Sequence, residues 1–181
     1  MTMTSESTEI PTPPPPSGRP VSGVIWLYRF DAAGKASARP IDEPFELFDP
    51  NDGFLWLHLD LVDRLARVWI EKTVGLPAAA RAVLLGTDEL PMLECDDTAV
   101  WGVFIDTIQD PEDDELRAAP MRFVLGDGYL VSGRRHPVRS AALMRSRVEA
   151  GHPVSGPVAL FELMIVQVLR AIGEMLRELR D

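Results

Sequence analysis

The chain has 181 residues, of which 46% are hydrophobic and 25% are charged, and its formal net charge is -10. These values suit one globular domain with a sizeable core, and the acidic balance argues against a nucleic-acid-binding face, which requires clustered Lys and Arg. The single cysteine, Cys95, excludes an internal disulfide, and no apolar run approaches the roughly 20 residues that a membrane span needs.

The first 20 residues are rich in Ser, Thr, Glu and Pro, with four consecutive prolines at positions 13–16. This composition predicts a disordered or polyproline tail over residues 1–20. The N-terminus lacks the basic region followed by an apolar region that marks a secretory signal, so we expect a cytoplasmic location. We place the folded domain at residues 21–156 and a long terminal helix at residues 157–181.

Two runs rich in β-forming residues follow the tail, at residues 24–30 and 54–60. A turn at residues 31–34 and a proline-broken stretch at residues 39–52 lie between them. In the second run, FLWLHLD, apolar residues occupy both alternating faces. We therefore predict a largely buried strand in a sheet that helices cover on both sides.

Two short helices are predicted next, over residues 63–73 and 77–85. Asp63 is a suitable N-cap for the first helix, and Gly86 closes the second. We expect the first helix to bury an apolar face formed by Leu65, Val68 and Trp69.

Four consecutive strands are predicted at residues 90–96, 98–108, 121–125 and 129–132. The last two are joined by Gly126-Asp127-Gly128, a strong hairpin signal. Because consecutive strands pair as antiparallel hairpins, we expect an α/β fold with a mixed, largely antiparallel sheet. A helix over residues 137–150 follows, with apolar positions expected at Val138, Ala142, Leu143 and Val148.

The terminal stretch from Pro157 has apolar residues at spacings of three and four, which is helical periodicity with a seam. The stripe consists of Phe161, Ile165, Val168, Ile172, Met175 and Leu179, broadened by Leu169 and Leu176. Pro157 suits the first turn, and no Gly, Asn or Pro follows the last apolar residue of the pattern as a stop signal. Two interpretations remain open: a helix docked on the core and frayed at its end, or a longer helix that continues past Asp181.

No catalytic motif is visible in the sequence. The three histidines, His58, His136 and His152, have no metal-ligand spacing, and the position of His58 on a buried strand indicates a hydrogen-bonded core residue. If the chain were a free-standing enzyme, Asp60, His58 and Asp106 would be the first candidates for its site.

The most distinctive local feature is DTIQDPEDDE at residues 106–115, which holds six acidic residues in ten. A divalent cation with oxygen ligands would relieve the repulsion between packed carboxylates, so we predict a Ca²⁺, Mg²⁺ or surface Zn²⁺ site. Its candidate ligands are Asp110, Glu112, Asp113 and Asp114. The segment lacks the glycine and the ligand spacing of an EF-hand, and the alternative interpretation is a solvated acidic loop.

Seven arginines make the region after this segment locally basic: Arg117, Arg122, Arg134, Arg135, Arg139, Arg145 and Arg147. They could pair with the acidic segment or with a neighbouring subunit. They could equally lie in solvent, where each ion pair is worth under about 1 kcal/mol.

From about residue 21 onward, the chain resembles the cytoplasmic N-terminal domain of the CorA-type divalent-cation transporters, in particular the ZntB-like zinc transporters. The segments that carry the resemblance, in order and spacing, are FLWLHLD at 54–60, LPMLE at 90–94, MRFVL at 121–125 and YLVSGRRHP at 129–137, followed by the long terminal helix. The junction RRHP at 134–137 is closer to the ZntB branch than to the magnesium branch.

The resemblance implies a fold of α/β/α layers and a homopentamer at the cytoplasmic face of the bacterial inner membrane. It implies that the terminal helix continues as a stalk into a first transmembrane helix. The domain would form an ion funnel and could sense a divalent cation, with zinc preferred over magnesium, and would need neither a cofactor nor covalent chemistry. The alternative is a free-standing α/β regulatory or enzymatic domain that oligomerises through its C-terminal helix.

Overall fold

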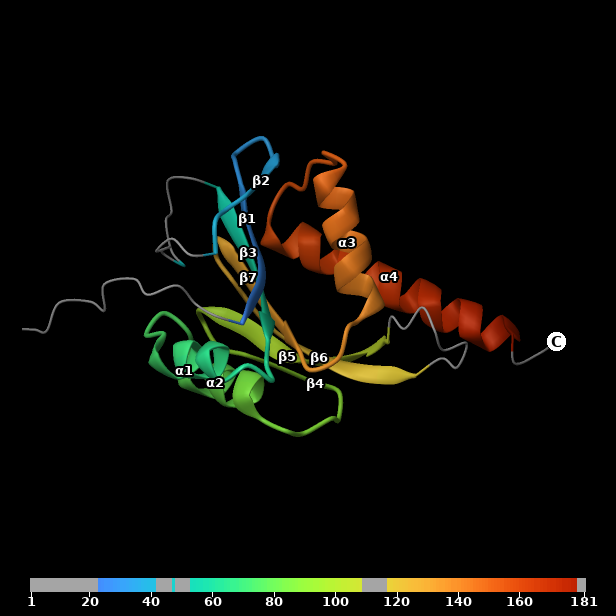
Figure 1. Ribbon diagram of the computed structural model, residues 1–181, viewed down its shortest axis with the longest axis horizontal. Coiled ribbons are helices and arrows are strands. Elements are labelled where there is room, and N and C mark those ends of the chain that lie inside the picture. The colour runs from blue at the N-terminus through green and yellow to red at the C-terminus, as the bar shows by residue number, and fades with distance from the viewer. Residues whose placement is uncertain (1–22, 42–46, 48–52, 109–116, 179–181) are drawn as a thin grey trace, which may run out of the picture.

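The computed structural model describes residues 23–41, 47, 53–108 and 117–178. Within these residues, seven strands form one sheet in the order β2-β1-β3-β7-β6-β5-β4. The helices α1 (Arg64–Lys72) and α2 (Ala78–Leu85) cover one face of the sheet, and α3 (Arg139–Glu149) and α4 (Pro157–Glu178) cover the other (Figure 1). The predicted α/β fold with a mixed sheet between two helix layers is confirmed.

The sheet contains one parallel pair among the described strands, β3 with β7, and all other neighbours are antiparallel. The predicted hairpin between β6 and β7 is present, and Gly128 at its turn has φ +82°, a conformation that favours glycine. The strands are β1 (Val24–Phe30), β2 (Ala36–Ala38), β3 (Phe54–Asp60), β4 (Met92–Cys95), β5 (Ala99–Thr107), β6 (Ala118–Gly126) and β7 (Tyr129–Arg134).

The two faces of the sheet differ in chemistry. The α1/α2 face is mainly aliphatic, although Trp101 and Tyr129 also belong to it, and its buried residues include Leu55, Leu57, Leu59, Ile70 and Leu84. The α3/α4 face is aromatic, and its buried residues include Trp26, Tyr28, Phe30, Phe54, Trp56 and Phe123. The alternation of β3 explains the difference, because its leucines point to one side and its aromatic residues to the other.

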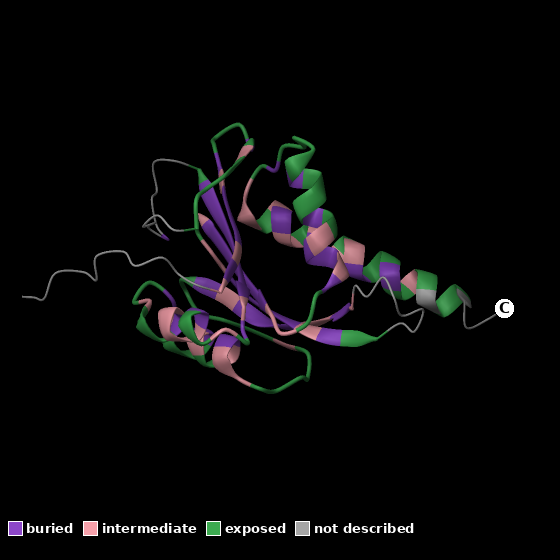
Figure 2. Ribbon diagram, in the orientation of Figure 1, coloured by how far each residue is buried: buried purple, intermediate pink, exposed green. Residues whose placement is uncertain are grey.

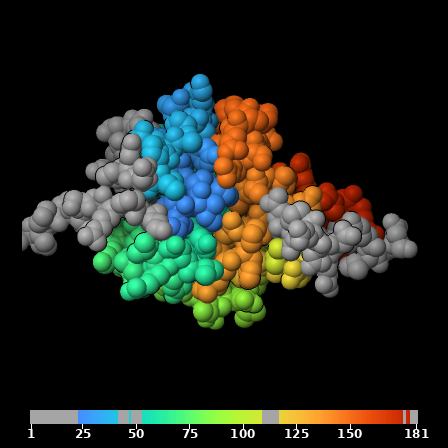
Figure 3. Space-filling view, in the orientation of Figure 1, coloured from blue at the N-terminus to red at the C-terminus, as the bar shows by residue number. Residues whose placement is uncertain are grey.

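The α3 helix is tied to β1 by polar contacts at the surface. Tyr28 Oη donates a hydrogen bond to Glu149 at 2.7 Å, and the Arg145 guanidinium lies 5.3 Å from the centre of the Trp26 ring. In the space-filling view, the orange surface of α3 adjoins the blue surface of the N-terminal strands (Figure 3). This contact fixes α3 over the aromatic face at the end opposite β4.

Helix α4 has two apolar faces instead of the single predicted stripe. Its inner face is buried against the domain and consists of Leu160, Met164, Val168 and Ala171. Its other apolar residues form an exposed row, here called the outer stripe, which consists of Val166, Leu169, Ile172 and Leu176. The helix runs beyond α3 toward the C-terminus, and its far end is largely exposed (Figure 2). The side chains of Met175 and Leu179, which the prediction also included, lie outside the described residues.

Two predicted helix faces were correct only in part. In α1, Trp69 packs against the core and Val68 is partly buried, but Leu65 is 53% exposed, and the buried residues are Ala66 and Ile70. In α3, Val138 and Val148 are buried as predicted, whereas Leu143 is exposed and the other buried residues include Ala141 and Met144. Counting apolar residues located each helix but did not establish its rotation.

The strand predictions missed β2 and the beginning of β6. β2 is three residues long and consists of Ala and Ser, which carry little β signal. β6 begins at Ala118 and includes Pro120, a residue that usually breaks strand assignments. The predicted tail at residues 1–20 lies outside the described residues. Among the described helices, none is both long enough and apolar enough to cross a bilayer.

Candidate functional site

The outer stripe of α4 is the most extended exposed apolar feature of the described chain. The exposed fractions are 38% for Val166, 61% for Leu169, 39% for Ile172 and 56% for Leu176. Their spacings of three and four residues place them in a row along the helix. A row of large apolar side chains in water is a candidate surface for contact with another molecule.

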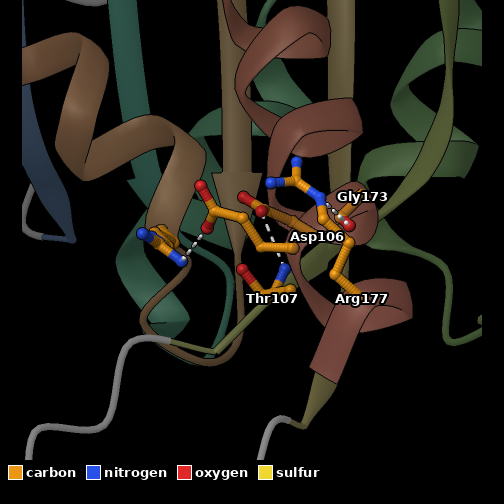
Figure 4. Close-up of polar contacts among 6 residues, drawn as sticks. Asp106, Thr107, Gly173 and Arg177 are labelled. Carbon is orange, nitrogen blue, oxygen red and sulfur yellow. Dashed lines mark hydrogen bonds and ion pairs between the residues drawn. The ribbon is translucent and has the colours of Figure 1, made fainter. Parts of the chain in front are cut away.

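The N-terminus of α3 is held by Asp106, the last-but-one residue of β5. Asp106 Oδ2 accepts hydrogen bonds from the backbone nitrogen of Ser140 at 3.0 Å and from its Oγ at 2.5 Å. Asp106 Oδ1 accepts from the Thr107 backbone nitrogen at 2.7 Å (Figure 4). The residue at the N-cap position, Val138, has no side chain that can cap, so a carboxylate from the sheet satisfies the helix instead.

Asp106 is 2% exposed, and its burial raises the pKa of the carboxyl group. The hydrogen bonds from Ser140 and Thr107, and the charge of Arg139, act in the opposite direction. Both carboxylate oxygens are therefore engaged with the protein. This arrangement suits a structural cap, and it leaves Asp106 poorly placed as a catalytic acid.

The far part of α4 makes a polar contact with α3 next to this cap. Arg139 Nη1 lies 3.4 Å from Glu174 Oε2, and the two side chains are 44% and 50% exposed. One turn further along, Arg177 Nε donates to the Gly173 carbonyl at 3.1 Å within α4 itself (Figure 4). Exposed ion pairs of this kind contribute little stability, so the end of α4 is only weakly tied to the domain.

His58 is a fully buried residue of β3, as predicted, and it belongs to a hydrogen-bonded group on the aromatic face. Its Nδ1 lies 2.8 Å from Ser132 Oγ, which also accepts from Trp56 Nε1 at 3.0 Å. The Trp26 ring stacks on the imidazole with centroids 4.1 Å apart. Burial, and to a lesser extent the charge of Arg134, lowers the pKa of His58 well below 6.5. The imidazole is therefore neutral at physiological pH.

The three residues proposed for an enzyme site do not come together. His58 and Asp60 belong to β3, whereas Asp106 belongs to β5, and β7 and β6 lie between these strands. Three strand spacings of about 4.8 Å each separate them by roughly 14 Å. Asp60 Oδ1 instead accepts from the Val62 backbone nitrogen at 2.9 Å. Ser132 and Ser140, the partners of His58 and Asp106, carried no sequence signal because single serines are common.

The predicted metal ligands Asp110, Glu112, Asp113 and Asp114 lie outside the described residues. In the part of the chain that the structure describes, no group of three or more His, Cys, Asp or Glu side chains could hold a metal ion. The metal site therefore stays a prediction.

A family model described as "CorA-like Mg2+ transporter protein" matches residues 51–181. This range begins just before β3 and includes the whole of α4. No curated protein sequence matches the chain.

Three solved structures have a similar fold. The full-length CmaX protein has a TM-score of 0.78 and 19% identity, and the match covers 91% of this chain and 50% of that protein. The ZntB cytoplasmic domain from Vibrio parahaemolyticus RIMD 2210633 has a TM-score of 0.65 and 19% identity, and the match covers 86% of this chain and 64% of that one. The soluble domain of CorA from Methanocaldococcus jannaschii has a TM-score of 0.63 and 12% identity, and the match covers 88% of this chain and 62% of that one. The chain thus spans between half and two thirds of each of these structures.

Proposed function

The chain belongs to the family of CorA-like Mg²⁺ transporter proteins, and from this premise we propose that it is the cytoplasmic domain of a divalent-cation membrane transporter. The observation that carries the proposal is the family match, which extends over the whole of α4. In the proposed role, the domain forms the funnel through which ions approach the membrane and takes no part in covalent chemistry. Its net charge of -10 supports this role, because an acidic surface concentrates cations.

We propose that α4 is the first part of a stalk helix that leads from the domain to the bacterial inner membrane. The 22 residues of α4 correspond to about 33 Å of helix. Its inner face, which runs from Leu160 to Ala171, holds it on the domain, and its far end extends past α3 (Figure 1). A helix that must transmit force or position between a domain and a membrane needs such a docked end and a projecting end.

We propose that the outer stripe is covered by the same helix of neighbouring copies, in a homopentamer of the full-length protein. Val166, Leu169, Ile172 and Leu176 are separated by three, three and four residues, which suits a seam between helices. No other segment among the described residues covers them. Self-association would remove this apolar row from water.

Sedimentation velocity of the chain over a range of concentrations tests this proposal. We expect association that strengthens with concentration, and we expect Leu169→Glu to abolish it by placing a charge in the seam. Val158→Glu is the matched control, because Val158 is a similarly exposed apolar residue of α4, at 56%, that lies at the docked end. A monomer at every concentration, or equal loss in both variants, would contradict the proposed seam.

For the transported ion we propose zinc in preference to magnesium, and for a regulatory cation site we propose Asp110, Glu112, Asp113 and Asp114. The similarity to the ZntB cytoplasmic domain supports the first choice, and oxygen-ligand chemistry supports the second. Calorimetric titration with Zn²⁺ and with Mg²⁺ tests the site. We expect binding heat that disappears when the four residues are changed to Asn and Gln; heat that persists in that variant would disprove the assignment.

A further inference from the structure

Two arginines on the α1/α2 side of the molecule hold the connection between α2 and β4. Arg122 of β6 donates from Nη2 to the carbonyl of Asp88 at 2.5 Å. Arg135, which follows β7 directly, donates from Nη2 to the carbonyl of Gly86 at 2.7 Å. The connection, residues 86–91, contains neither helix nor strand, and residues 87–91 are exposed.

The two guanidinium groups are neighbours on one face of the sheet. Arg122 is paired in register with Gly133 of β7, and Arg135 is two residues further along the same chain segment. The two arginines donate to the carbonyls of Asp88 and Gly86, which are two residues apart in the same connection, so their guanidinium groups lie close together. The positive charge of Arg135 adds to burial in lowering the pKa of Arg122.

Neither arginine has a carboxylate partner among the described residues. Arg122 is 1% exposed, yet its Nε and Nη1 atoms, and Nε of Arg135, are buried without a hydrogen-bond partner in the described chain. The carboxylates of Glu89 and Asp88 act on Arg122 from a distance and form no ion pair with it. A guanidinium stays charged at any pH that a folded protein meets, so the buried charge of Arg122, next to the partly exposed Arg135, favours a negative group that accepts hydrogen bonds.

We propose that Arg122 and Arg135 bind a small inorganic oxyanion, phosphate or sulfate, beneath the connection of α2 and β4. Such an ion accepts several N–H hydrogen bonds at once and neutralises both charges, which a single carbonyl cannot do. The burial of Arg122 selects a free ion over a phosphate ester, because an ester group needs room beside the phosphate. Because the free nitrogen atoms are buried, the ion enters only when the exposed connection at residues 87–91 moves aside. This site lies on the face opposite α4 and does not depend on the proposed transport role.

Thermal unfolding and calorimetric titration of the chain with sodium phosphate and sodium sulfate, against sodium chloride at the same ionic strength and pH, test the proposal. We expect the midpoint of unfolding to rise with oxyanion concentration and to follow the saturation law of a ligand that binds only the folded state. Chloride should leave it unchanged after correction for ionic strength. An identical response to chloride and phosphate would overturn the proposal, because it would reveal only general screening.

Variants identify the site. Arg135→Gln should weaken phosphate binding at least about tenfold, since it removes one charged donor group. Arg147→Gln changes the net charge equally at an exposed position of α3 and should bind phosphate like the unchanged chain. Arg122→Gln should also lose binding; if it does not fold, Arg135→Gln decides the question. Unaltered phosphate affinity in Arg135→Gln would refute the assignment.

Adenosine monophosphate tests the choice of a free ion. Its phosphate carries a bulky ester, and we expect it to give no shift at concentrations at which inorganic phosphate saturates the site. An equal shift with the nucleotide would overturn the assignment to a small inorganic ion.

Discussion

The inner face and the outer stripe of α4 are both apolar and have opposite surroundings. On the inner face, Leu160, Met164 and Val168 are buried against the domain. On the outer stripe, Leu169, Ile172 and Leu176 are just as apolar, yet they are exposed and the described chain offers them no cover. The fold of this chain accounts for the inner face, whereas the proposed self-association would account for the outer stripe.

This difference separates residues that stabilise the domain from residues that are proposed to contact other copies. Burial of a large side chain stabilises a fold by about 1.5–3 kcal/mol, and an exposed side chain contributes almost none of this. Changes on the two faces of α4 should therefore affect different measurements, and the largest loss of stability should come from the inner face.

Met164→Ala should destabilise the domain by about 2–5 kcal/mol, because Met164 is fully buried and its truncation leaves a cavity between α4 and the sheet. Leu169→Ala, on the outer stripe, should change the stability of the monomer by less than about 0.5 kcal/mol. Urea unfolding at a low protein concentration measures both. If the two variants lost equal stability, the division of α4 into a buried inner face and an exposed outer stripe would be wrong.

The stability of the domain should depend on pH through His58, which lies in the aromatic face beneath α3 and α4. Its pKa is lowered in the folded state, so below pH 6.5 the unfolded chain binds more protons than the folded chain, and stability falls as the pH decreases toward the folded pKa. The slope reaches at most about 1.4 kcal/mol per pH unit. The ordinary pKa of histidine is 6.5. Urea unfolding at this pH and at about one pH unit below it measures how the free energy of unfolding changes with pH.

His58→Gln should remove this slope, because glutamine does not titrate and can still bond Ser132. His152→Gln serves as the control, since His152 is exposed and lies outside the core. A slope that persisted in His58→Gln would assign the pH dependence to another group. A slope that disappeared in the control variant would do the same.

Asp106→Asn should cost about 1–2 kcal/mol, since an amide presents one oxygen where the carboxylate presents two. One of the donors on Ser140 or Thr107 would then face an NH₂ group and lose its acceptor. Because Asp106 holds α3 and α3 packs on α4, the loss should appear as increased amide exchange at the beginning of α3. Exchange that increased only in α1 and α2 would contradict this role.

The sequence was sufficient to predict most of the fold, because its strongest signals are local. The alternation in FLWLHLD, the Asp63 cap and the glycine hairpin after β6 each depend on a few adjacent residues, and each was confirmed. The rotation of α1 and α3 was predicted only in part, since it depends on which side of the helix meets the sheet. Leu65 and Leu143 are apolar but exposed for this reason.

The polar groups could not be predicted from the sequence for a related reason. Asp106 belongs to an acidic run, and its partner Ser140 is 34 residues away in the chain, so nothing local marks it as a cap. Arg122 is one of seven arginines for which the sequence predicts either solvent exposure or an ion pair. Its exposure is only 1%, because β6 is paired between β5 and β7. These polar contacts join segments that are distant in the chain, and composition and spacing do not reveal them.

The smallest expected effect concerns the ion pair between Arg139 and Glu174, which links the far part of α4 to α3. Glu174→Gln should change stability by less than about 0.5 kcal/mol, because both side chains are about half exposed and water screens their attraction. A double-mutant cycle with Arg139→Gln isolates the interaction energy from the effect of each residue alone. A coupling above about 1 kcal/mol would show that α3 holds the far part of α4. The exposure of the outer stripe would then need an explanation other than self-association. A coupling near zero would leave the end of α4 free to pack against other copies.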